Sequence, residues 1–140
     1  MLKKLQQKGA ISGFKRTPQR LSILEHLDGN TSHPSADDIY RVVAKKNPSM
    51  SFATVYNTLN TLVEAGAVRE LTIDPDRKRY DPDTSAHHHL ICLDCRKVAD
   101  ISGDIPVEVP RGVAKDFAIF GSHIEFYGLC TACRPRKKKK

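Results

Sequence analysis

Two Cys-x-x-Cys pairs constrain the fold of this chain more than any other feature of its 140 residues. They are Cys92 with Cys95 and Cys130 with Cys133, and they hold every cysteine in the sequence. Two such turns supply the four sulfur ligands of a tetrahedral zinc ion. A site filled by four protein ligands leaves no position for a reactive water, so we interpret it as a structural zinc site. Because 34 residues separate Cys95 from Cys130, a further structured segment is expected between the pairs.

Redox-active thiols and disulfides are the alternatives for these cysteines. A redox function needs one Cys-x-x-Cys motif, whereas two motifs account for the whole cysteine content here. The N-terminal residues lack the apolar segment of a signal peptide, and no apolar run is long enough to cross a membrane. We therefore expect a cytoplasmic chain with no membrane partner, where thiols stay reduced, and we favour zinc.

Charge is distributed unevenly along the chain, whose formal net charge is +7. Residues 1–80 contain 13 Lys and Arg against 8 Asp and Glu, whereas residues 81–133 contain 4 against 8. Residues 134–140 form a basic tail with six Lys and Arg and no acidic residue, suited to non-specific contact with phosphates. A basic first half and an acidic second half indicate a nucleic-acid-binding domain joined to a cation-binding domain.

The first 80 residues show the signals of three short helices and a hairpin. Thr17 and Pro18 mark one helix start, and Ser35 with Asp38 forms a capping box at the second. The third helix is predicted over residues 51–65, and Gly66 after it is the C-terminal signal. Residues 68–73 and 78–80 flank a turn and predict a hairpin. Three helices and a hairpin predict a winged helix-turn-helix domain over residues 1–80.

A winged helix binds double-stranded DNA through its third helix, which enters the major groove. The outward face of residues 51–65 has small polar side chains that can reach base edges. The hairpin adds basic side chains, including Arg79, near phosphates. The alternative is that these side chains belong to a solvent-exposed turn and do not contact DNA. The candidate DNA contacts are Ser51, Thr54, Tyr56, Asn57, Arg77 and Lys78.

Beyond a hinge at residues 81–84, the pattern changes to short strands. Strands are expected over residues 89–91, 98–101 and 124–127, with a short helix over residues 111–117. The fold class is therefore α+β: an N-terminal winged helix followed by a small α/β domain at residues 85–133 that includes the four cysteines.

Histidine and aspartate residues form a second candidate metal-binding cluster beside the first cysteine pair. Alternate side chains of an extended segment share a face, so His87 and His89 point one way and His88 the other. With Asp81 and Asp100 nearby in sequence, they offer nitrogen and oxygen ligands suited to Fe(II), Mn(II) or Zn(II). Spacing alone does not bring His33 into this group.

A zinc hydrolase is one alternative, but the chain has no His-Glu-x-x-His motif. Another is a nucleic-acid-binding module with no sensing role.

These motifs together resemble the ferric uptake regulator family of metal-dependent repressors. The resemblance covers about residues 14–133. It rests on residues 17–20 (TPQR), 33–40 (HPSADDIY), 53–57 (ATVYN), 79–81 (RYD), 87–95 (HHHLICLDC) and 127–133 (YGLCTAC). It implies a homodimer that binds a palindromic operator, a C-terminal dimerisation domain and a structural zinc on the four cysteines. It also implies a regulatory Fe(II) or Mn(II) ion held by His33, Asp81, His87, His89 and Asp100.

Within the family, the chain is most similar to the peroxide-sensing branch. Asp100 stands where iron- and zinc-uptake regulators usually have Glu, Asp81 is also an aspartate, and Asn57 replaces a usual Arg. The resemblance implies a repressor rather than an enzyme, in which Fe(II)-catalysed oxidation of His33 or His87 releases metal and DNA. The alternative is an iron- or zinc-responsive repressor without self-oxidation.

We expect no extra metal site from His88, Glu108 and His123, because Ala86 replaces the usual leading histidine and His123 is displaced by one position.

Overall fold

A computed structural model describes residues 14–74 and 76–134 of the chain. The chain divides into two units, Met1–Thr84 and Ser85–Lys140, which are described separately below. Of the predicted basic tail, only Arg134 is among the described residues, and residues 1–13 of the predicted DNA-binding domain lie outside them.

Three helices form the first part of the first unit, and their starts follow from local capping. They are α2 (Pro18–Leu27), α3 (Ala36–Lys46) and α4 (Phe52–Glu64). Thr17 accepts a hydrogen bond from the backbone N–H of Arg20 at the start of α2. At the start of α3, the Ser35 hydroxyl accepts from the Asp38 N–H, and the Asp38 carboxylate accepts from the Ser35 N–H. These caps satisfy backbone donors that have no partner within the helix.

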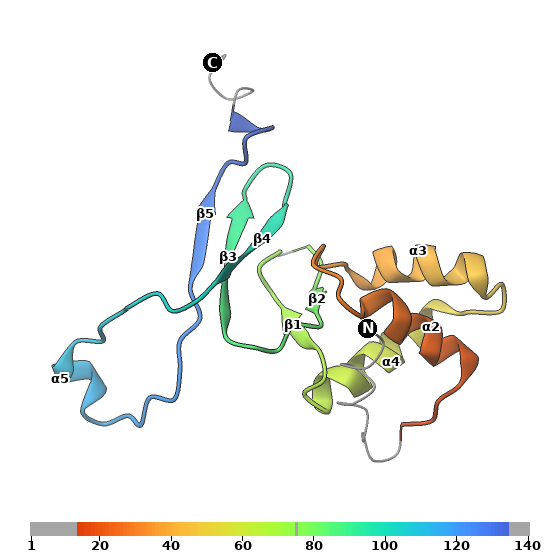
Figure 1. The fold of residues 1–140 in the computed structure, drawn as a ribbon, viewed down its shortest axis with the longest axis horizontal. Helices are drawn as coiled ribbons and strands as arrows, with labels where there is room; N and C mark the ends of the chain where they lie inside the picture. Colours follow the sequence, from red (N-terminus) through yellow and green to blue (C-terminus); the bar gives the residue numbers. More distant parts are fainter. Residues whose placement is uncertain (1–13, 75, 135–140) are drawn as a thin grey trace. The chain divides into compact units, whose positions relative to one another are not determined.

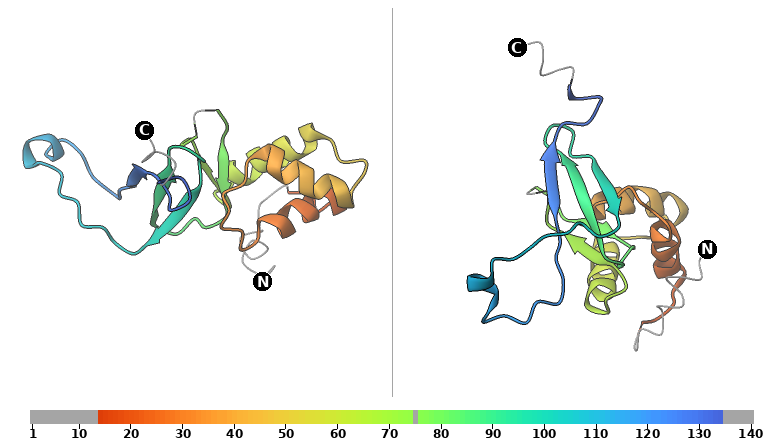
Figure 2. Two further views of the ribbon diagram at one scale, coloured as in Figure 1. Left: turned by 90° about the horizontal axis from the view of Figure 1, so that it is seen from above. Right: turned by 60° about the vertical axis from the view of Figure 1, so that its left-hand side comes forward.

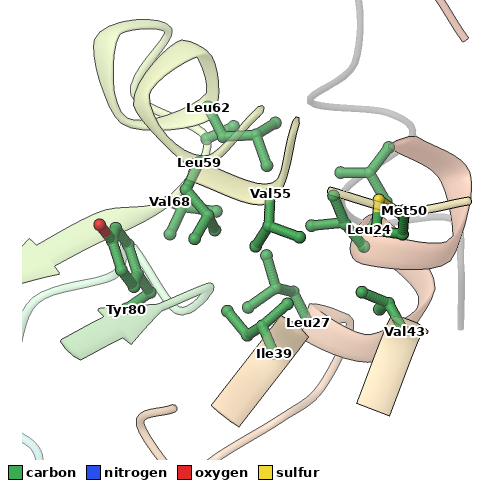
Figure 3. Close-up of a cluster of buried hydrophobic side chains, with 12 residues drawn as sticks. Leu24, Leu27, Ile39, Val43, Met50, Val55, Leu59, Leu62, Val68 and Tyr80 are labelled. Carbon is green, nitrogen blue, oxygen red and sulfur yellow. The ribbon is translucent and has the colours of Figure 1, made fainter. Parts of the chain in front are cut away.

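The core of this unit lies where the three helices meet the hairpin. Ile39 and Val43 of α3, like Val55, Leu59 and Leu62 of α4, recur at helical spacing and are buried. Figure 3 shows these side chains converging with residues of α2 and with the ring of Tyr80.

A short hairpin completes the first unit. Strand β1 (Arg69–Leu71) pairs antiparallel with β2 (Arg79–Asp81), so that Glu70 faces Tyr80. Three helices followed by this hairpin form the predicted winged helix (Figure 1).

The second unit is built on a three-stranded sheet. Its strands are β3 (His87–Cys92), β4 (Val98–Ser102) and β5 (Glu125–Gly128). Strand β3 lies in the centre, antiparallel to β4 and parallel to β5, as the views in Figure 2 show. Between β4 and β5 the chain forms α5 (Arg111–Ala114), which is three residues shorter than predicted. Pro110 provides no side-chain cap for α5, and Gly112 lowers its helix propensity. The mixture of helices and sheet confirms the predicted α+β class.

The second unit has little apolar core of its own. Among its described residues, the buried apolar side chains are Ile91, Cys92, Val98 and Cys133. Many larger ones are exposed, among them Phe117 at 71% and Phe120 at 98%. A domain this small needs a metal, disulfides or a partner subunit to be stable. Within the described part of the chain, no helix is long and apolar enough to span a membrane.

Candidate metal centres

The four cysteine sulfurs of the second unit converge on one point. Cys92 ends β3, Cys95 follows in the turn after it, and Cys130 and Cys133 follow β5. Because β3 and β5 are parallel neighbours, their carboxyl ends bring the two pairs together. All four Sγ atoms lie within 4.8 Å of one another, and those of Cys95 and Cys130 are 3.8 Å apart. A tetrahedral zinc with Zn–S bonds of about 2.3 Å requires sulfurs about 3.8 Å apart. The group therefore fits a closed zinc site.

Backbone N–H groups around these cysteines favour the thiolate form that zinc needs. The N–H of Cys130 lies 3.4 Å from the Cys92 sulfur, and hydrogen bonds from Cys130 and Cys95 hold the Cys92 pKa at about 6. Hydrogen bonds from Cys133 likewise lower the pKa of Cys130. Burial has the opposite effect on Cys133 and raises the pKa of its thiol. In the metal-free chain, Cys92 is therefore a thiolate at neutral pH, whereas the proton of Cys133 must be displaced by a metal.

A histidine–aspartate group lies at the other end of the same sheet. His87 and His89 project from one face of β3, and Asp100 stands opposite His89 in β4. The Nε2 atoms of His87 and His89 lie 3.4 and 3.3 Å from the same oxygen, Asp100 Oδ1. The Nδ1 atom of His87 lies 2.9 Å from the carbonyl oxygen of Ser85. When Nδ1 donates to that carbonyl, Nε2 keeps a lone pair that can bind a metal.

A second histidine–aspartate pair lies in the first unit. His33 Nε2 is 3.3 Å from Asp81 Oδ2, and both side chains are buried. Arg79 fixes the loop of His33, because its guanidinium donates to the His33 carbonyl at 3.1 Å and to Asp74 Oδ2 at 3.2 Å. His33 has φ of 52°, a left-handed conformation that is unfavourable for a non-glycine residue and persists only where surrounding contacts impose it.

Strand β2 explains how distant residues form this pair. The N–H of Tyr80 donates to the Pro34 carbonyl at 2.9 Å, and Ser35 forms a bridge with Arg79. Arg79 and Asp81 share one face of β2 because side chains alternate along a strand. The loop before α3 is therefore held along β2, and the Asp81 carboxylate lies beside His33.

The spacings within each group are those of neighbouring metal ligands. Ligands about 2.1 Å from a metal, at angles of 90° to 109°, are about 3.0–3.4 Å apart. The observed distances of 3.3 and 3.4 Å agree with that range and exceed a normal charged hydrogen bond. The first unit offers one nitrogen and one oxygen, and the second unit two nitrogens and one oxygen. Such imidazole and carboxylate sets suit Fe(II), Mn(II) or Zn(II).

His88, His123 and Glu108, the residues considered for an extra metal site, each have different surroundings. The Nδ1 atom of His88 accepts a hydrogen bond from the Ile124 N–H at 3.0 Å. His123 instead lies against His89, with 2.8 Å between His123 Nε2 and His89 Nδ1. Glu108 is exposed in the segment before α5. Sequence reasoning missed the contact between His123 and His89, because nothing in the local pattern pairs a residue before β5 with one in β3.

The candidate DNA contacts lie on α4 and the hairpin of the first unit. The hydroxyl of Ser51 caps α4 by accepting from the Thr54 N–H, and Tyr56 and Asn57 are exposed. On the hairpin, Arg77 is exposed, and the exposed Lys78 lies 2.7 Å from Glu70. Arg79 differs from the expectation of a phosphate contact, because its guanidinium points inward to Asp74 and the His33 carbonyl. Which of the other residues contact DNA stays a prediction.

The chain is similar in sequence and in structure to known metal-dependent regulators. The chain is 41% identical over 128 residues to the peroxide operon regulator of Bacillus subtilis, covering 90% of this chain and 88% of the relative. It resembles the structure of the ferric uptake regulator from Francisella tularensis with iron, at 25% identity and a TM-score of 0.71, covering 87% of this chain and 96% of that one. It also resembles a structure of PerR from Streptococcus pyogenes, at 32% identity and a TM-score of 0.53, covering 94% and 92% of the two chains.

A winged helix joined to a sheet with four converging thiols and a histidine–aspartate group defines a metal-dependent transcription regulator. The model of the ferric uptake regulator family matches residues 11–127. The chain belongs to the ferric uptake regulator family, and its curated relatives at 35–41% identity are peroxide regulators. Members of this family are transcription regulators rather than enzymes, bind DNA and act as dimers. Zinc together with iron or manganese fits the two kinds of donor group found here.

Proposed function

We propose that this chain is a peroxide-responsive repressor, which binds a palindromic operator while it holds Fe(II) or Mn(II) and releases it after oxidation. The observation that carries the proposal is the presence of two chemically different donor sets. The four thiols of Cys92, Cys95, Cys130 and Cys133 suit a permanent zinc, whereas imidazoles and carboxylates bind Fe(II) or Mn(II) more weakly and exchangeably. A structural ion and a regulatory ion can therefore coexist in one chain.

We propose further that one regulatory ion takes ligands from both units. His33 with Asp81 offers two donors, and His87, His89 and Asp100 offer three. Each set alone leaves positions of a five- or six-coordinate ion unfilled. An ion that joins both sets fixes the angle between the winged helix and the second unit. Metal then favours the DNA-binding arrangement, because it binds that arrangement better than the others.

Peroxide sensing follows from the chemistry of Fe(II). Held by these ligands, Fe(II) would activate peroxide for oxidation of a ligand imidazole. In the net reaction the ring of His33 or His87 gains one oxygen atom of peroxide, and the other oxygen leaves as water. The oxidised ring is a poorer ligand, so that the regulatory metal and then the operator are lost. The two aspartates support this function over simple iron or zinc sensing, since Asp81 and Asp100 match the sensor pattern. The names of the relatives also support it.

A homodimer is supported by the exposed apolar side chains of the second unit. Monomeric proteins rarely expose large apolar areas, and such areas usually mark interfaces. Here Val113, Phe117, Ile119, Phe120 and Tyr127 are all more than half exposed. A dimer that buries them presents two winged helices, as a palindrome with two half-sites requires. Helix α4 then enters the major groove, with Ser51, Thr54, Tyr56 and Asn57 facing DNA and Arg77 and Lys78 near phosphates.

Mass spectrometry of the metal-loaded protein tests the sensing proposal. The zinc-loaded chain is given Fe(II) or Mn(II) without oxygen, treated with peroxide, and digested. We expect peptides with His33 or His87 to gain one oxygen in the Fe(II) form only, together with loss of operator binding. A peptide with His26, which belongs to neither donor set, is the internal control.

Two outcomes separate the alternatives. Unmodified His33 and His87 peptides with intact operator binding after peroxide would show an iron- or zinc-responsive repressor without self-oxidation. Operator binding that does not depend on Fe(II) or Mn(II) at all would remove the regulatory metal from the account.

A further inference from the structure

His123 contacts His89, a candidate metal ligand. The proposed function assigns no role to this contact. Its Nε2 atom lies 2.8 Å from Nδ1 of His89, and the two ring centroids are 5.0 Å apart. The two residues are 34 positions apart, His89 in the middle strand and His123 in the segment that leads into β5. His89 is fully buried, whereas the side chain of His123 is 36% exposed.

The backbone around His123 is tied firmly to β3. The Ile124 N–H donates to His88 Nδ1 at 3.0 Å, and the Ile124 carbonyl accepts from the His89 N–H at 3.1 Å. Ile124 is thus held on both sides of its own backbone by two consecutive residues of β3. The preceding residue, His123, is thereby placed beside the His89 ring.

The positions of the ring protons follow from which nitrogen faces the metal-binding group. His89 Nε2 faces Asp100 Oδ1 at 3.3 Å, so a metal bound there requires a lone pair on Nε2. The proton of the neutral His89 ring is then on Nδ1, which donates to His123 Nε2. The proton of His123 is consequently on its own Nδ1, which faces Glu125 Oε1 at 3.7 Å. His123 thus pairs with His89 at hydrogen-bond distance, whereas Glu125 lies near its other nitrogen but beyond hydrogen-bond distance.

We propose that His123 is a positioning residue for His89: it fixes the ring tautomer and orientation in which Nε2 binds the regulatory metal. This inference rests on the proposed function, because it takes His89 as a ligand. Hydrogen-bond acceptors behind a ligating histidine orient the ring and raise its basicity, and their loss typically costs about 10–100-fold in metal affinity.

The other ligating histidine of this sheet shows why the arrangement is specific to His89. His87 Nδ1 lies 2.9 Å from the carbonyl oxygen of Ser85, so its acceptor is part of the backbone. The acceptor for His89 is a side chain and can be replaced by mutation. Of the two candidate ligands His87 and His89, it is therefore His89 whose Nδ1 pairs with a side chain that mutation can replace.

Manganese affinity in three variants of the full-length, zinc-loaded chain tests the proposal. His123→Leu removes the acceptor and keeps an apolar side chain, whereas His123→Gln restores an acceptor oxygen. His26→Leu is the matched control, a histidine-to-leucine change in the first unit. Free Mn(II) is measured by electron paramagnetic resonance, and zinc content and dimer formation are measured on the same samples. The tautomer of His89 is read in the manganese-free protein from long-range nitrogen–proton couplings.

We expect His123→Leu to weaken Mn(II) binding about 10–100-fold and to move His89 away from a pure Nδ1–H tautomer. His123→Gln should bind within a few-fold of wild type, His26→Leu should match wild type, and all variants should retain their zinc. Unchanged Mn(II) binding in His123→Leu would overturn the inference, as would equal losses in His123→Leu and His123→Gln. A His89→Ala variant separates the two proposals. If it also binds Mn(II) normally, both the proposed ligand set and this inference fail; if it alone loses Mn(II), only the role of His123 fails.

Discussion

Replacing Arg79 by methionine should destabilise the winged helix far more than its place in a basic hairpin suggests. The side chain of Arg79 is 15% exposed and that of Asp74 is 7% exposed, so their ion pair is mostly shielded from water. The same guanidinium donates to the carbonyl of His33. Methionine keeps the apolar stem of the side chain and removes both hydrogen bonds.

The expected magnitude follows from these two bonds. A hydrogen bond to a charged group contributes roughly 1.5–3 kcal/mol, and a buried carboxylate left without its cation adds a further penalty. We expect a loss of about 3 kcal/mol in the free energy of unfolding, after allowing for relaxation around Asp74. For a unit of this size, that corresponds to a melting temperature lower by about 12–24 °C.

Circular dichroism at 222 nm on the full-length, zinc-loaded chain measures this loss, since α2, α3 and α4 provide most of its described helix. Lys78→Met is the matched control, because Lys78 is the adjacent cation, 53% exposed and paired with Glu70 only at the surface. Solvent-exposed pairs contribute little, so the control should melt close to wild type. If Arg79→Met melts no lower than Lys78→Met, Arg79 does not hold the His33 loop in the way described.

Three further perturbations follow from the fold and the cysteine site. Leu59→Ala removes a fully buried side chain and should cost about 2–5 kcal/mol, measured by urea unfolding. Ser35→Ala removes the cap of α3 and should cost about 1 kcal/mol in the same assay, with Ser32→Ala as the exposed control. Zinc affinity should fall more steeply below pH 6 than above it, because the pKa of Cys92 is held at about 6 and zinc must displace one more proton below that pH. Competition with a chromophoric chelator across pH 5–8 measures that slope, and an unchanged slope through pH 6 would contradict the assignment of Cys92.

Locally encoded features were accessible from the sequence. The caps at Thr17 and Ser35 depend on side chains within three residues of the N–H groups they satisfy, so each can be recognised in a short window. His87 and His89 share one face because side chains alternate along a strand, so strand geometry alone predicts their placement. Zinc chemistry predicts that the two Cys-x-x-Cys turns form one site.

Features that depend on long-range contacts were not accessible. His33 and Asp81 are 48 positions apart and meet because the loop before α3 lies along β2, which no local pattern encodes. Resemblance to a family, rather than periodicity, predicted that these two residues belong together. Arg79 reads as a surface cation in sequence, yet its side chain points inward because Asp74 and the His33 carbonyl offer better partners than water.

The extent of α5 shows a different limit. Residues 111–117 have a helical composition, but the helix ends at Ala114, where the Phe117 N–H bonds to the Ala114 carbonyl in a turn. A short helix without caps gains too little from propensity to extend itself. No residue of α5 is buried, so packing adds nothing that would extend the helix beyond Ala114.

The central claim is that a single regulatory ion takes ligands from both units, and Mn(II) binding to two single variants and their double variant tests it most directly. Asp81→Ala removes a donor of the first unit, and His89→Ala removes one of the second. The account predicts one tightly bound Mn(II) per wild-type chain, a large loss of affinity in either single variant, and little further loss in the double variant. Two independent Mn(II) ions per chain, each lost in only one of the single variants, would contradict it.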